Sequence, residues 1–243
     1  MLRSFACAVL LGVLAPAAAG QPIETDRPDF TESTETVPAG RLQLEAGTSA
    51  ARLAGTTSVS GPELLVRAGV LPRLELRVEL PDYINAGASG FSDAAAGGKV
   101  RIGPFGGWGL AAIAMVTLPV GDSVFSSGHV DPSLTATASR NVGRFSLGLQ
   151  AGAARLPGES RTELATTLVV GTDLSDGVGS FVEFAAGDIA GDPSVVFHHG
   201  YTISLRDALQ LDIHAGAGLA GDAPAWLIGA GLGVGIGRGD RDQ

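Results

Sequence analysis

The eight residues from Arg73 to Leu80 alternate strictly between a charged and an aliphatic side chain. Successive side chains of a β-strand point to opposite faces, so this segment places four charges on one face and four aliphatic groups on the other. Weaker versions of the pattern recur about every 10 to 20 residues towards the C-terminus. A soluble sheet can contain one such strand. A series of them behind an export signal predicts a transmembrane β-barrel, apolar towards lipid and polar towards a lumen.

The first 20 residues have the three parts of a secretory signal peptide. Arg3 supplies the positive end, residues 5–14 the apolar core, and residues 17–19 the small side chains before cleavage. The apolar run is too short to span a bilayer and is interrupted by Pro16, which argues against a membrane anchor. We therefore predict that residues 1–20 are a cleaved signal peptide.

The composition of the remaining chain excludes several classes of protein. Its only cysteine, Cys7, leaves with the signal, so neither a disulfide nor a thiolate metal site is expected. No later segment is apolar enough for a membrane-spanning helix. The net charge of −9, which becomes −10 without Arg3, argues against a nucleic-acid partner. Aromatic residues make up only 5%, which is sparse for a barrel that usually carries aromatic girdles.

The chain divides into an arm, a barrel and a tail. Residues 21–40 show no strand or helix period and predict a periplasmic arm or a plug in the barrel mouth. Residues 41–237 predict an antiparallel up-and-down barrel of about twelve strands, and 238–243 a C-terminal tail. The expected strands are 41–50, 63–71, 73–80, 96–103, 109–118, 133–141, 144–153, 162–172, 179–186, 194–205, 209–219 and 225–237.

The connections between these strands alternate in length. Short ones such as 71–73 mostly alternate with longer loops, which are expected at 51–62, 81–95, 119–132, 156–161, 187–193 and 220–224. Bacterial outer-membrane barrels have short periplasmic turns and longer outer loops, so both termini are expected in the periplasm. Aspartates in the outer loops, for example Asp93 and Asp122, could bind cations that bridge lipopolysaccharide, although such residues are more often turn formers.

Polar residues, Glu45 and Glu183 among them, alternate with the apolar ones and are expected to face the lumen. The predicted lining residues are Glu75, Arg77, Glu79, Lys99, Arg101, Asp212 and His214. These charges could line a selective pore, or they could form salt bridges that fill a closed interior, and the pattern leaves both open. Asp26, Arg27 and Asp29 of the arm could pair with them and plug or gate the periplasmic mouth.

Three motifs that could suggest other chemistry have simpler interpretations. Glycine at every second position of residues 229–237 is one strand with a bare inner face, because a dinucleotide fingerprint needs a turn and a helix. His198 and His199 are adjacent and point to opposite faces, so no metal site is predicted, although His198 and His214 could both face inward. No Gly-x-Ser-x-Gly elbow precedes a helix, so neither an enzyme nor a cofactor is expected.

Both ends of the chain resemble a known family. The segments 23–33 and 37–47, which include Thr25-Asp26-Arg27-Pro28-Asp29, and the segments 205–212, 216–219 and 223–226 carry the resemblance. They are similar to transporter-like outer-membrane proteins of the phenol meta-cleavage degradation pathway (the MetA-pathway phenol degradation family). The resemblance implies a bacterial outer-membrane barrel associated with passage of aromatic or other small hydrophobic compounds. It also implies outer-membrane lipid, lipopolysaccharide and the barrel-assembly machinery as partners, although the tail 237–243 lacks the usual terminal aromatic residue.

The function predicted from these observations is a passive channel or uptake pore for small compounds, with aromatic or hydrophobic compounds as candidate solutes. Two alternatives stay open at this point. One is a closed structural outer-membrane barrel without transport, and the other is a soluble periplasmic β-protein that binds a small apolar ligand.

Overall fold

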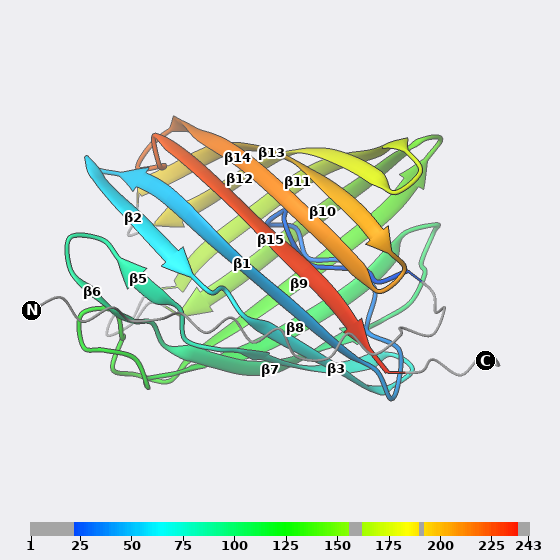
Figure 1. Ribbon diagram of the computed structural model, residues 1–243, viewed down its shortest axis with the longest axis horizontal. Helices are drawn as coiled ribbons and strands as arrows, with labels where there is room; N and C mark the ends of the chain where they lie inside the picture. The colour runs from blue at the N-terminus through cyan, green and yellow to red at the C-terminus, as the bar shows by residue number, and fades with distance from the viewer. Residues whose placement is uncertain (1–21, 156–161, 190–191, 238–243) are drawn as a thin grey trace, which may run out of the picture.

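The computed structural model describes residues 22–155, 162–189 and 192–237, which fold into a closed antiparallel β-barrel (Figure 1). The predicted signal peptide and tail lie outside these residues. Twelve strands form the wall, as the alternation predicts. They are β1 (Leu42–Leu53), β3 (Leu65–Leu71), β4 (Leu74–Glu79), β7 (Ala94–Arg101), β8 (Gly109–Leu118), β9 (Asp131–Val142), β10 (Phe145–Arg155), β11 (Thr162–Ser175), β12 (Val178–Ile189), β13 (Asp192–Arg206), β14 (Leu209–Ala220) and β15 (Trp226–Ile236).

The wall closes where the first strand pairs with the last. The β1–β15 register runs from Leu42 opposite Ile236 to Arg52 opposite Trp226. Every other wall strand pairs with its neighbours in chain order, so the sheet is the predicted up-and-down barrel. Closure leaves no free sheet edge, which is the condition for placing backbone amides in hydrocarbon. Within the described ranges, no helix is long and apolar enough to cross a membrane.

The two ends of the barrel differ in their connections. The end that carries the turns after β3, β9, β11 and β13 is called the short-turn end, and the other is called the loop end. The prediction of plain loops at 51–62 and 81–95 was wrong, because these segments contain β2 (Thr56–Gly61), β5 (Tyr83–Asn85) and β6 (Ser89–Phe91). β2 forms a hairpin with β1 through Ala54 and Gly55, which both have positive φ, as a tight two-residue hairpin turn requires.

The connection between β12 (Val178–Ile189) and β13 (Asp192–Arg206) is shorter than expected. β12 runs to Ile189 and β13 begins at Asp192, so the predicted loop 187–193 is mostly strand. Sequence propensity assigned Gly and Asp there to a loop, but cross-strand pairing of the two neighbours extends the ladder. The expected loop 156–161 lies outside the described residues.

The side chains divide between the two faces as the alternation predicts. On β4, Leu76 is 51% exposed on the outer face, whereas Glu75 and Arg77 are 0% and 1% exposed inside. The outer face carries a belt of exposed aliphatic residues around the whole wall, including Leu42, Leu149, Leu168, Ile213 and Ile228. This polar interior and apolar exterior is the reverse of a soluble domain and is that of a transmembrane barrel.

We expect a charge in the middle of this belt to destabilise the barrel strongly. Leu168→Arg, halfway along β11, should lower the free energy of unfolding by about 2–4 kcal/mol, because the guanidinium would enter hydrocarbon. Leu174→Arg, near the short-turn end of the same strand, should cost only about 0–1 kcal/mol. Reversible guanidinium unfolding in lipid vesicles measures both. Equal costs at the two positions would contradict the assignment of the belt to lipid.

Candidate functional site in the barrel lumen

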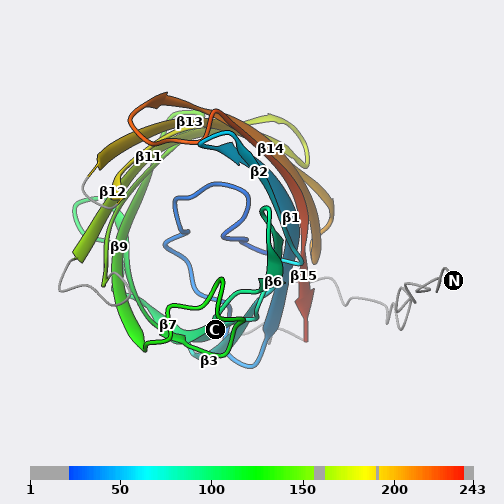
Figure 2. The ribbon, with the colours of Figure 1, turned by 90° about the vertical axis from the view of Figure 1, so that its left-hand side faces the viewer.

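The N-terminal segment, residues 22–40, lies inside the barrel and is called the arm (Figure 2). It enters at the short-turn end, where the Ile23 amide donates to the Asp207 carbonyl at 2.8 Å. It reaches the middle of the lumen near Phe30, whose amide donates to Glu183 at 2.9 Å. It then returns to the short-turn end, where Glu35 pairs with Arg101 at 2.8 Å. The arm is therefore a loop inserted into the lumen from one end.

Glycines on the facing strands leave room for the arm. A Cβ at Gly47 or Gly231 would overlap the guanidinium of Arg27, and one at Gly233 would overlap Thr25. Any larger residue would therefore force the arm off the wall. The alternating glycines of β15 are thus the surface on which the arm packs, in agreement with the bare inner face expected from the sequence.

Three cations of the wall surround one carboxylate of the arm. Arg67 of β3, Arg77 of β4 and Lys99 of β7, here called the basic cluster, are each at most 1% exposed. Lys99 Nζ lies 2.8 Å from both carboxylate oxygens of Asp26. Arg77 Nη1 lies at 2.7 Å and Arg67 Nη1 at 3.2 Å from the same group. The basic cluster therefore holds the arm through charge-assisted hydrogen bonds, which are the strong ones.

Two acids of the wall hold the basic cluster in position. Glu75 accepts from Arg67 Nε at 2.9 Å and from Nη2 at 3.1 Å, and Glu45 accepts from Arg67 Nη1 at 2.8 Å. Both glutamates are fully buried. Together with Asp26 they provide three carboxylates for the three cations, so the wall alone is one negative charge short of neutrality. Buried charges need such pairing, because an unpaired one is costly in a low-dielectric interior.

The residue after Asp26 pairs with two acids outside the basic cluster. Arg27 Nη1 lies 2.7 Å from Glu63 Oε2, just before β3, and its Nη2 lies 3.4 Å from Asp212 Oδ1 of β14. Two consecutive arm residues thus supply an anion to the basic cluster and a cation to these two acids.

A hydrogen-bonded chain of side chains receives the middle of the arm. Glu183 of β12 accepts from the Thr31 hydroxyl at 2.6 Å and lies 2.9 Å from His198 Nδ1. His198 Nε2 in turn lies 2.8 Å from His214 Nδ1. The ring of Phe30 stacks on His198 with centroids 4.3 Å apart. His198 and His214 therefore do face inward together. His198 contacts Phe30 of the arm and hydrogen-bonds to His214.

The burial of the arm changes the pKa values of its acids in two directions. Burial alone would raise the pKa of Asp26, but the basic cluster, led by Lys99, outweighs it and holds that pKa well below its ordinary value. Burial and the neighbouring Asp26 carboxylate raise the pKa of Glu32 to about 8. Burial and the nearby Glu183 raise the pKa of Asp29 well above its ordinary value. The lumen therefore accommodates Asp26 as an anion and disfavours Asp29 and Glu32 in that form.

The predicted lining residues do not all join one site. Glu75, Arg77 and Lys99 meet around the arm, and Asp212 and His214 lie on β14. Arg101 pairs with Glu35 near the short-turn end, and Glu79 is exposed at the last residue of β4. Sequence reasoning missed Arg67, the most paired cation, because its strand is otherwise too apolar to alternate clearly. It also placed Glu45, Glu183 and His198 inside without assigning them a role.

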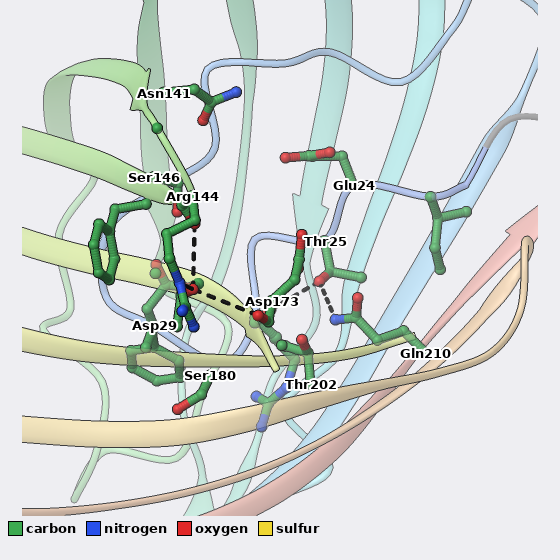
Figure 3. A pocket seen from close by; sticks show the side chains of 18 residues that line it. Glu24, Thr25, Asp29, Asn141, Arg144, Ser146, Asp173, Ser180, Thr202 and Gln210 are labelled. Atoms are coloured by element: carbon green, nitrogen blue, oxygen red, sulfur yellow. Dashed lines mark hydrogen bonds between the residues drawn. The ribbon is translucent and has the colours of Figure 1, made fainter. Parts of the chain in front are cut away.

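The arm leaves a polar cavity beside it at the short-turn end (Figure 3). The cavity has a volume of about 470 Å³ and lies between residues 23–29 of the arm and strands β9 to β14. Hydroxyl and amide side chains converge on it, namely Thr25, Asn141, Ser146, Ser180, Thr202 and Gln210. The arm therefore narrows the lumen at this end without filling it.

The loop aspartates considered above as cation ligands accept hydrogen bonds from backbone amides of the loops instead. Asp93 accepts from the backbone amides of Gly121 and Ser127, at 2.9 and 3.0 Å. Asp122 accepts from the Phe91 amide at 2.8 Å. Among the described residues, no group of three or more His, Cys, Asp or Glu side chains is arranged to hold a metal ion.

The chain was compared with protein families and with solved structures. A family model described as "Putative MetA-pathway of phenol degradation" matches residues 25–235, which is most of the chain. The chain belongs to this family. The match includes the arm from Thr25 onwards, so the arm and the barrel both belong to the pattern of this family. A search of functionally curated proteins finds no match.

Solved structures with the same fold are outer-membrane channels. The COG4313 outer membrane channel from Pseudomonas putida F1 has a TM-score of 0.64 at 15% identity, covering 84% of this chain and 98% of that one. The KdgM porin in complex with disordered oligogalacturonate has a TM-score of 0.58 at 8% identity, covering 81% and 99%. The NanC porin has a TM-score of 0.57 at 10% identity, covering 79% and 98%. At these identities the likeness establishes the fold.

We expect docking of the arm to weaken as the pH rises. Glu32 has an ordinary pKa of 4.5 and a pKa of about 8 in the lumen, where it faces Asp26, Arg77 and Lys99. A raised pKa means that docking favours the protonated form, so its contribution is complete below about 4.5 and lost as the pH passes 8. The depressed pKa of Asp26 acts oppositely, and its contribution is lost only below its ordinary value of 3.8.

A nitroxide spin label at Thr36→Cys measures this directly, since its mobility reports release of the arm. The mobile fraction should increase from pH 5 to pH 8.5 and should change less in Glu32→Gln. The double variant Glu32→Gln/Asp29→Asn, which removes two of the three arm acids with a raised pKa, should flatten the curve further. A label that becomes more mobile on acidification to pH 5 would contradict the assignment.

Proposed function

We propose that the protein is an outer-membrane channel that passes small solutes passively and that its arm closes or narrows the channel. The observation that carries the proposal is a polar lumen with buried charges, inside a wall whose outer face is apolar. A barrel that only had to be stable could fill its interior with apolar side chains, since buried ion pairs are weak contributors to stability. The proposal assigns no catalytic role to any residue.

The family and the fold support this proposal. The family description refers to phenol degradation, and solved barrels of this fold are channels or porins by their titles. Small aromatic or hydrophobic compounds are therefore candidate solutes. The short-turn end would lie in the periplasm, with lipopolysaccharide around the loop end, and the barrel-assembly machinery would insert the chain. Asp26, Arg27 and Asp29 would act as the plug, and the lining would comprise Glu75, Arg77, Lys99, Asp212 and His214, with Glu79 and Arg101 towards the two ends.

A closed structural barrel is the second candidate, and one observation favours it. Asp26 balances the charge of the basic cluster and Arg27 pairs with Glu63 and Asp212, as the docked arm of a permanently sealed barrel would. The two candidates differ in one property, which is whether the arm leaves the lumen while the barrel remains folded.

A reversible covalent lock of the arm separates these candidates. Thr34 Oγ1 and Ser139 Oγ lie 2.6 Å apart, so cysteines at these positions are close enough for a disulfide. In planar bilayers, oxidised Thr34→Cys/Ser139→Cys should show low, steady conductance, and reduction should restore openings. The wild-type barrel under the same reductant is the control. Conductance that is absent in every state, or unchanged by the lock, would contradict a gated pore.

A substitution on the glycine surface should open the channel without deleting the arm. Gly47→Leu places a side chain where the Arg27 guanidinium lies, so the arm should be displaced and the open fraction should rise severalfold. Ala230→Leu adds a similar side chain to the exposed outer face of the neighbouring strand β15 and should leave the conductance unchanged. An equal effect of both variants would show that the lumen surface is not special.

A further inference from the structure

We infer that the basic cluster is a binding site for the carboxylate of a small solute and that the arm occupies it with Asp26 until a solute carboxylate takes its place. This inference rests on the proposed function, because a solute reaches the cluster only through the lumen. It assigns a chemical class of ligand, a monocarboxylate, and a way in which that ligand promotes opening.

The first argument is the geometry around Asp26. Lys99, Arg77 and Arg67 converge on one carboxylate at 2.7 to 3.2 Å, and the Ser33 amide adds a fourth donor at 2.9 Å. Guanidinium and ammonium groups arranged in this way match a carboxylate in charge and in hydrogen-bond direction. Three of the four donors belong to the wall, so they remain when the arm leaves.

The second argument is the rigidity of the site. Arg67 is fixed by the two-point contact with Glu75 and by Glu45, so its side chain is already oriented before any ligand arrives. Glu75 Oε1 also lies 3.4 Å from Arg77 and 4.0 Å from Lys99. A preorganised site loses little conformational freedom on binding, which is what distinguishes a recognition site from a set of mobile surface charges.

The third argument is charge. Without Asp26, the three cations face only Glu45 and Glu75, which leaves one positive charge in the lumen wall. Outside the cluster the lumen carries Glu63 just before β3, Glu183 of β12 and Asp212 of β14, which would repel an anion once Arg27 has left with the arm. A small anion in the open lumen is therefore directed to the basic cluster. The excess acids of the arm, Glu24, Asp29 and Glu32, make return of the arm less favourable than a single carboxylate.

The inference is tested with the spin label at Thr36→Cys in the full chain in detergent, with acetate and benzoate as probes and chloride at equal ionic strength as control. In the wild-type background, either carboxylate competes with Asp26 and should raise the mobile fraction. In Asp26→Ala, which leaves a space of carboxylate size, acetate should instead restore immobility. The same ligand thus acts with opposite sign in the two backgrounds.

Charge-assisted hydrogen bonds to a carboxylate predict a half-effect concentration about tenfold lower for acetate than for chloride. Adding Lys99→Met to Asp26→Ala should remove the rescue, whereas Glu35→Ala, which removes an arm carboxylate outside the cluster, should produce a label that acetate does not immobilise. If the Lys99 variant does not fold, the competition in the wild-type background still decides. Equal effects of acetate and chloride in both backgrounds would overturn the inference.

This measurement does not depend on conduction, so the two proposals fail separately. A barrel that conducts but responds to acetate as it does to chloride keeps the channel and loses the carboxylate site. A barrel that binds acetate at the cluster but never conducts keeps the site and loses the channel.

Discussion

Everything in this structure depends on hydrogen-bond closure of the wall. A backbone amide in hydrocarbon has no water to bond to, so an open sheet edge in the membrane would cost several kcal/mol for each unpaired group. Pairing of β1 with β15 over eleven residue pairs removes that edge. Once the sheet is closed, the two-residue period of the strand sends alternate side chains to lipid and to lumen. The exposed belt that includes Leu76 and Leu168 and the buried charges at Glu75 and Arg77 are two consequences of one constraint.

Closure creates a second problem, which the arm solves. Charges that are kept out of lipid must be satisfied inside, and the wall does not satisfy them alone. The basic cluster has one cation more than its wall carboxylates, and Glu63 and Asp212 have no wall cation among their ion pairs in the described residues. Asp26 of the arm balances the cluster, and the adjacent Arg27 supplies the cation that pairs with both acids. Glycines allow the approach, because a Cβ at Gly47, Gly231 or Gly233 would overlap the arm. Three features therefore depend on one another, because the bare glycine surface lets the Thr-Asp-Arg-Pro-Asp segment reach the charges of the polar lumen.

The wall could be predicted from sequence and the site only partly, for a physical reason. Strand alternation is local, so segments such as 73–80 and 109–118 indicate strands and faces without knowledge of the partner, and all twelve wall strands were anticipated. The short strands β2, β5 and β6 were not anticipated, because their pairing is decided by tertiary contacts with β1 and with each other. The meeting of Asp26 with Lys99 joins residues 73 apart and a segment without any period to the wall. No local pattern encodes that distance. What the sequence did contain was the glycine alternation at 229–237, which predicted a bare inner face that either leaves the lumen open or lets another segment pack closely.

The chemical groups that hold the arm in the lumen decide how firmly the arm is held. A plug held by apolar packing would be released slowly and unselectively, because its affinity would depend on area alone. A plug held by one carboxylate among three buried cations can be displaced by any group that reproduces that carboxylate, and its release removes Arg27 from Glu63 and Asp212 in the same step. Glu32 makes docking of the arm depend on pH, since burial and Asp26 raise its pKa to about 8 and its ionised form opposes docking. In the proposed channel, an arm that carries more acid than the cluster can neutralise would be held strongly enough to close the lumen and weakly enough to leave it, which a wholly complementary plug would not be.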